Sequence, residues 1–184
     1  MKVLLIIAAI LVAGLASGYE YINVRNELAD QRNAIRASWA AVEDAIDKRA
    51  ELVPGVIAVV ERRAKTGSEV IQELNEARLA LAAARTPPEK IQANAKLEAA
   101  LTRLLDQAQG DTRWKKDRQW RNLLDELATA KNRIAEERQK YNDAVKQYNT
   151  NIQLFPKNVV AALAGFARED AYFKTEQGAP RRPR

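Results

Sequence analysis

Apolar residues recur at helical spacing from residue 120 to residue 155. The positions are separated alternately by four and three residues, and neither Gly nor Pro interrupts the stretch. At about 1.5 Å per residue, the pattern predicts one α-helix of about 50 Å whose apolar stripe is buried against other helices. The stripe comprises Trp120, Leu124, Leu127, Lys131, Ile134, Arg138, Tyr141, Val145, Tyr148, Ile152 and Phe155.

Two positions of this stripe, Lys131 and Arg138, are charged. Charges in a buried stripe must be paired or must extend to water. A polar layer that fixes register is one interpretation, and a local drift of the stripe to Ala130 and Ala135 is the simpler one.

A second stripe of the same spacing predicts a helix of similar length near the N-terminus. Pro54 falls inside it, but Val53 and Ile57 stay in phase across the proline, so we expect a kink or a restart with the same face inward. Gly67 marks the expected end. The stripe consists of Leu28, Ile35, Trp39, Val42, Ile46, Val53, Ile57 and Val60.

Two shorter helices are expected between these long ones. Thr66 with Glu69 forms one helix-start signal, and Thr86 with Glu89, enclosing two prolines, forms a stronger one. Gly110 ends the second of these helices, and residues 159 to 173 suit a short helix over the end of the bundle. No segment has the alternating pattern of a β-strand.

The fold class predicted is therefore all-α, with an elongated up-and-down four-helix bundle. If Thr86-Pro87-Pro88 is a kink and not a reversal, residues 68 to 109 form one arm of a three-helix rod. The three arms would each be about 60 Å long at about 1.5 Å per residue, which favours the rod. The capping box with two prolines favours the reversal.

Residues 3 to 22 form an apolar segment of the length that crosses a bilayer. Glu20 is the one charge inside it, and the tyrosines lie where a spanning helix meets lipid headgroups. A membrane anchor is the favoured interpretation, and a cleaved secretory signal is the alternative. The anchor residues are Val3, Leu4, Leu5, Ile6, Ile7, Ile10, Leu11, Val12, Leu15, Tyr19 and Tyr21.

The domain organisation follows: an anchor at 1–22, a helical bundle at 23–174 and a disordered basic tail at 175–184. Lys2 before the span and Glu20 at its end favour a bundle outside the cytoplasm. Arg25, Arg32 and Arg36 after the span favour the opposite orientation.

The chain of 184 residues has no Cys and no His. These absences exclude disulfides, thiolate nucleophiles and the usual zinc sites, and a carboxylate di-metal site in a helical bundle also uses His. We therefore expect no enzymatic activity, no cofactor and no small-molecule substrate. The net charge is +6, but Arg181, Arg182 and Arg184 supply half of it, so the body of the protein is only mildly basic.

One basic patch contains interleaved tryptophans. It runs from Arg113 to Arg121, and its possible membrane-contact residues are Trp114, Lys115, Lys116 and Arg118. Trp120 belongs to the apolar stripe, which leaves too few exposed aromatic rings for base stacking, so nucleic-acid binding is not expected. A structural helix start is the first interpretation and a membrane-surface contact the second.

Several motifs, in their order, resemble the LemA family of bacterial membrane-anchored proteins. The most specific is the block that places Tyr141-Asn142 and Tyr148-Asn149 one heptad apart, before Phe155-Pro156. The other motif positions are Arg32-Asn33, Trp39, Lys48-Arg49, Leu52-Val53-Pro54, Ala77-Arg78, Ala93-Asn94, Leu97, Asn132-Arg133-Ile134-Ala135, Val145, Ile152 and Gly165-Phe166.

The chain departs from the family pattern at Gly55, where Asn is usual, and at Asp111-Thr112, where Tyr-Pro is usual. The resemblance implies a helical bundle behind one span in the bacterial inner membrane, with no cofactor. Some members are implicated in forming the magnetosome membrane, which implies a membrane-organising role.

Two functions are consistent with these patterns. The first is a non-enzymatic scaffold or assembly protein that presents a long helical surface to a protein partner or to its own copies, with membrane lipid around its span. The second is an accessory or signal-transmitting subunit of a membrane complex.

Overall fold

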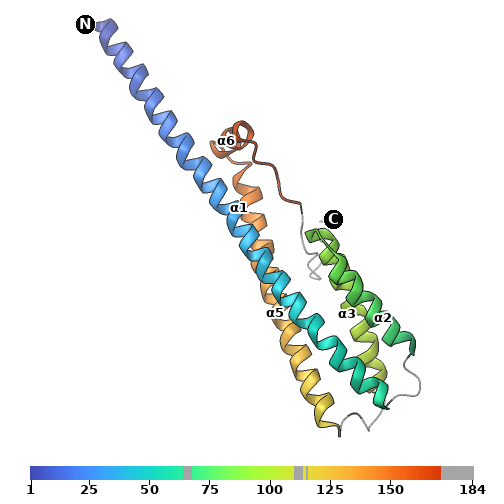
Figure 1. The fold of residues 1–184 in the computed structure, drawn as a ribbon. Helices are drawn as coiled ribbons and strands as arrows, with labels where there is room; N and C mark the ends of the chain where they lie inside the picture. Colours follow the sequence, from blue (N-terminus) through green and yellow to red (C-terminus); the bar gives the residue numbers. More distant parts are fainter. Residues whose placement is uncertain (64–67, 110–113, 115, 171–184) are drawn as a thin grey trace, which may run out of the picture. The chain divides into compact units, whose positions relative to one another are not determined.

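The computed structural model describes residues 1–63, 68–109, 114 and 116–170, and it is helical with no strand in those ranges. The predicted all-α class is therefore confirmed. The helices are α1 (Lys2–Arg63), α2 (Ser68–Ala83), α3 (Pro87–Gln109), α5 (Arg118–Asn151) and α6 (Lys157–Ala164) (Figure 1). The Thr66 helix-start signal and the tail at 175–184 lie outside the described residues.

Helix α1 continues through Pro54 without a restart. Val53 and Ile57 are both buried, so the prediction that the same face stays inward across the proline is confirmed. The next residue, Gly55, lies close to α5: a Cβ atom built there would be 3.4 Å from Leu123 Cδ2.

The chain reverses at residues 84 to 86. Thr86 and Glu89 form the predicted capping box: the Glu89 N–H donates to Thr86 Oγ1 (3.4 Å), and the Thr86 N–H donates to Glu89 Oε2 (3.1 Å). Hydrogen bonds from the backbone N–H groups of Arg85 and Thr86 lower the pKa of Glu89. Helices α2 and α3 pack against each other (Figure 1), which rules out a single arm over residues 68 to 109.

The long C-terminal helix is shorter than predicted. Helix α5 ends at Asn151, and residues 152 to 156 form a turn. The turn tightens through hydrogen bonds from Gln153 N–H to Thr150 O (3.1 Å) and from Leu154 N–H to Asn151 O (3.2 Å). Pro156, which has no N–H and restricts the residue before it, then prevents the helix from continuing. Phe155, predicted in the buried stripe, is 83% exposed.

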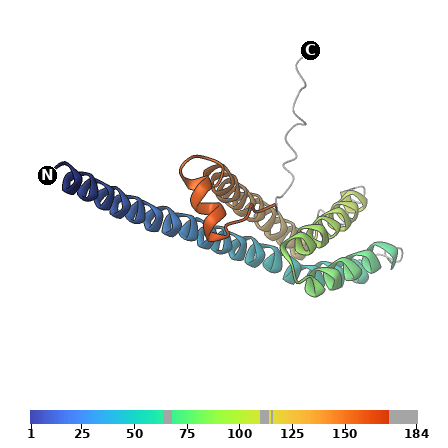
Figure 2. The same cartoon turned by 90° about the horizontal axis from the view of Figure 1, so that it is seen from above.

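The described chain divides into two compact units. The first contains Met1–Ser38 and Tyr141–Asp170, and the second contains Trp39–Lys140. In the first unit, α6 lies beside the N-terminal half of α1 (Figures 1 and 2). Its core consists of Val24, Leu28, Ile35, Tyr141, Val145, Tyr148, Val160 and Ala161.

The core of the second unit is drawn from all of its helices. The predicted second stripe is buried here from Val42 onward, Trp39 is half-buried, and Leu28 and Ile35 belong to the first unit. The largest fully buried side chains of this unit are Val42, Ile46, Val53, Val56, Val59, Val60, Leu74, Leu81 and Leu97.

Candidate functional site

The apolar N-terminal segment of α1 is exposed along its length. Among the described helices, one is long and apolar enough to span a membrane, by length and composition, and its apolar window is not buried in the protein. Of the predicted anchor residues, Tyr21 is half-buried and all the others are exposed. Exposed aliphatic side chains are unfavourable in water, whereas the interior of a bilayer would solvate them.

Tyr148 and Asn149 hold the segment that follows α6. The Tyr148 hydroxyl donates to Ala167 O (2.8 Å), the Asn149 side-chain amide donates to Glu169 O (2.7 Å), and the Glu169 N–H donates to Asn149 Oδ1 (2.9 Å). Burial raises the pKa of Tyr148. We call these two residues with residues 167 to 169 the C-terminal clasp.

The other predicted motif residues lie in different environments. Tyr141 is buried in the first unit, while Asn142 and Pro156 are half-buried. Pro54, Arg133 and Phe155 are exposed, so the motif is not one continuous core. Asn94 is buried in the second unit, where it meets a residue that the sequence patterns did not single out as a site.

That residue is Arg49, which is 3% exposed. Its guanidinium donates to Asn94 Oδ1 (2.5 Å) and to the Asn94 carbonyl oxygen (3.3 Å). Desolvation lowers the pKa of Arg49, and the charge of Glu98 opposes this effect. Among the described residues, its Nε atom has no hydrogen-bond acceptor.

Lys90 is a second buried cation in the same unit. Its ammonium group contacts Glu43 Oε1 (2.6 Å) and Asp47 Oδ2 (3.2 Å) on α1. Burial lowers the pKa of Lys90, but the hydrogen bonds to Glu43 and Asp47 outweigh it and raise the pKa above its usual value. Helix α3 thus contacts α1 through Lys90 as well as through Asn94.

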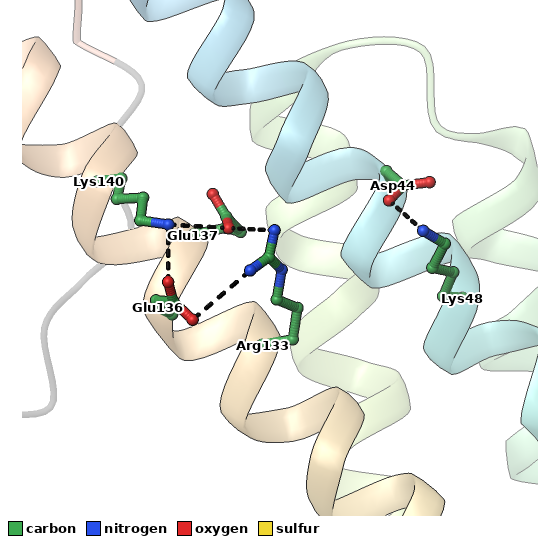
Figure 3. Close-up of polar contacts among 6 residues, drawn as sticks. All are labelled: Asp44, Lys48, Arg133, Glu136, Glu137 and Lys140. Carbon is green, nitrogen blue, oxygen red and sulfur yellow. Dashed lines mark hydrogen bonds and ion pairs between the residues drawn. The ribbon is translucent and has the colours of Figure 1, made fainter.

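Glu137 is the charged residue that is buried in the α5 stripe, whereas the sequence predicted Lys131 and Arg138 in this stripe. Glu137 is buried and contacts Arg133 Nη2 (2.8 Å) and Lys140 Nζ (3.2 Å) (Figure 3). Lys131 is exposed and lies 3.6 Å from Glu98.

The predicted drift of the stripe is half right. Ala130 is half-buried as expected, but Ala135 is exposed. The stripe passes through Leu127, Ala130, Ile134, Glu137 and Tyr141, in steps of three and then four residues, whereas the predicted stripe took four and then three.

A shallow groove of about 430 Å³ lies between α1 and α5 in the second unit. Its lining is mainly apolar, with charged side chains from both helices. The lining residues are Ala45, Lys48, Leu52, Asp125, Glu126, Thr129, Ala130 and Arg133. Beside it, Lys48 pairs with Asp44 (2.7 Å) along α1 (Figure 3).

The basic patch with tryptophans has a packed centre. Trp114 is buried, with its ring centroid 4.7 Å from that of Trp120. The burial of Trp114 against Trp120 supports the structural interpretation of this patch. Lys116 and Arg118 are exposed, and Lys115 lies outside the described residues.

These features define an all-helical protein whose first helix combines an exposed apolar segment with a packed one. The LemA family model matches residues 38–184, so the chain belongs to the LemA family. No curated protein matches the chain in sequence.

Proposed function

We propose that this protein is a non-enzymatic scaffold or assembly protein, anchored by one span in the bacterial inner membrane. Its bundle would lie outside the cytoplasm as an up-and-down four-helix bundle. The helical surface would bind a protein partner or other copies of the chain.

The observation that carries this proposal is the continuity of α1. One helix of 62 residues contains both the exposed apolar segment and, from Val24 onward, buried core positions. An unbroken helix leaves no flexible spacer between the lipid-facing part and the packed part. The first unit would therefore be held directly at the membrane surface.

The groove between α1 and α5 is the surface that we propose for partner binding. It combines apolar floor residues such as Leu52 and Ala130 with charges of both signs. An amphipathic helix that lays its apolar face into a groove and pairs its charges at the rim would match this chemistry. LemA membership supports the membrane location and is consistent with a scaffold.

A matched pair of variants tests the proposed surface. Thr129 and Thr102 are both exposed helical threonines whose hydroxyls donate to the carbonyl four residues earlier, at 2.8 and 2.9 Å, but only Thr129 lines the groove. We expect Thr129→Arg to remove crosslinked or co-purified bands from solubilised membranes, whereas Thr102→Arg leaves them. The absence of any band with the unmodified protein would contradict the scaffold proposal.

The same continuity of α1 favours a second candidate, a subunit that transmits a signal through its span. Replacing residues 3 to 22 with an unrelated apolar helix of equal length separates the two. A scaffold keeps its cellular phenotype after the exchange, and a signal-transmitting subunit loses it.

A further inference from the structure

The turn between α5 and α6 exposes large apolar side chains. Leu154, Phe155, Val159 and Leu163 are 54, 83, 49 and 72% exposed, respectively. Val159 and Leu163 are four residues apart and lie on one face of α6, while Leu154 and Phe155 lie in the turn just before this helix. We call these four residues the apolar foot.

The foot is part of a well-ordered local structure. The opposite face of α6 is packed through Val160 and Ala161. The helix ends at Gly165, which has φ of 73°, and the Phe166 N–H donates to Ala161 O (2.9 Å). Since both ends and the inner face of α6 are fixed, the outward direction of the foot is fixed as well.

The foot lies close to the end of the proposed span, within the same unit. Lys157 at the start of α6 forms an ion pair with Glu27 of α1. Glu27 follows Ile22 by five residues, which is about 7.5 Å along a helix. Farther along α1, the Arg32 guanidinium lies 5.8 Å from the centre of the Phe166 ring. Helix α6 is therefore held beside the part of α1 that emerges from the apolar segment.

We propose that the apolar foot is a second membrane contact, inserted into the headgroup and acyl-chain boundary of the leaflet from which α1 emerges. This inference rests on the proposed membrane anchor. A large exposed apolar cluster is unfavourable in water, and the neighbouring apolar surface of α1 continues toward the bilayer. Lys157, half-buried beside Glu27, suits the same boundary because its ammonium group can remain among headgroups.

The absence of cysteine from the chain allows a direct test with single-cysteine variants of the full protein. Phe155→Cys and Leu163→Cys report on the foot, Thr150→Cys on exposed α5 and Leu11→Cys on the span. Each variant is labelled with an environment-sensitive fluorophore and reconstituted in phosphatidylcholine–phosphatidylglycerol vesicles. Unchanged circular dichroism verifies that each variant is folded.

The expected result is quenching of the labels at 155 and 163 by a lipid spin-labelled near its headgroup, with several-fold weaker quenching by aqueous iodide than at 150. If the labels at 155 and 163 are quenched by iodide as strongly as the label at 150, while a lipid spin-labelled deep in its acyl chain quenches the label at 11, the foot does not contact lipid and the anchor is supported. If the acyl-chain quencher also fails to quench the label at 11, the proposed anchor is wrong.

A second copy of the chain is the competing occupant of the foot. In that case the labels at 155 and 163 are shielded from iodide and from lipid alike. A bis-maleimide then crosslinks the Phe155→Cys chains in pairs. That combination would also overturn the proposed lipid contact.

Discussion

The buried Arg49 guanidinium and the Asn94 side chain form a pair across 45 residues of sequence, with a 2.5 Å hydrogen bond between Nη2 and Oδ1. Arg49 Nη2 also donates to the Asn94 backbone carbonyl oxygen at 3.3 Å, so both of these acceptors belong to Asn94, while Nε has no acceptor among the described residues. The pair fixes the register of α3 against α1 in the second unit, because sliding either helix by a turn would leave the charge unpaired.

Removing the side-chain acceptor of Asn94 should lower the stability of the folded chain. We expect Asn94→Ala to lower the free energy of unfolding by about 1.5–3 kcal/mol, because a buried charge loses a charge-assisted bond. The double variant Arg49→Met with Asn94→Leu should recover most of the loss, since well-packed apolar residues often replace buried polar pairs without cost. Urea unfolding of the detergent-solubilised chain measures both. A double variant less stable than Asn94→Ala would contradict this interpretation.

The C-terminal clasp predicts that Tyr148→Phe and Tyr148→Ala lower stability by different amounts. Tyr148→Phe should cost about 0.5–1.5 kcal/mol through the lost bond to Ala167, while Tyr148→Ala should cost about 3–5 kcal/mol through the lost core volume. Thermal unfolding followed by circular dichroism distinguishes them. Equal losses of stability for the two variants would contradict this, because the hydroxyl bond and not the ring would then account for the contribution of Tyr148.

Tyr148 also predicts a pH dependence. Its pKa is raised in the folded protein through burial, so its contribution is complete below the ordinary tyrosine pKa of about 10 and is lost as pH rises through the folded value. The stability advantage of the unmodified chain over Tyr148→Phe should therefore shrink above about pH 10. Paired unfolding curves at neutral and alkaline pH measure this, and a constant difference would refute it.

Glu136 and Glu137 provide a matched pair of adjacent carboxylates on α5. Glu137 is buried between Arg133 and Lys140, whereas Glu136 is exposed and contacts the same two cations. We expect Glu137→Gln to lower the free energy of unfolding by about 1–3 kcal/mol and Glu136→Gln to change it little, because ion pairs of exposed groups contribute little to stability. Chemical unfolding of the two variants side by side measures the contrast, and similar losses would mean that Glu137 is not buried in solution.

Gly55 offers a stabilising change. Glycine inside a helix costs about 1 kcal/mol relative to alanine. An added Cβ would meet Leu123 at 3.4 Å, which is an ordinary contact distance. Gly55→Ala should therefore raise the melting temperature, with a gain of about 0.5–1 kcal/mol in stability. A lower melting temperature would indicate that α1 and α5 approach more closely than this.

Sequence periodicity predicted the helices and most of their buried faces, because spacing alone determines which side chains share a face. It placed Arg138 in the stripe, whereas the adjacent Glu137 is the buried residue. It also missed the Arg49–Asn94 pair, because the register between α1 and α3 depends on packing. The early end of α5 follows from the turn before Pro156, which the continued apolar spacing through Ile152 and Phe155 concealed.

The central claim, that the first part of α1 is an uncleaved membrane span, is tested most directly by alkaline carbonate extraction of membranes with mass determination of the retained protein. The prediction is that the chain stays in the membrane pellet and keeps residues 3 to 22. Release into the supernatant, or a mature chain that lacks this segment, would contradict the account.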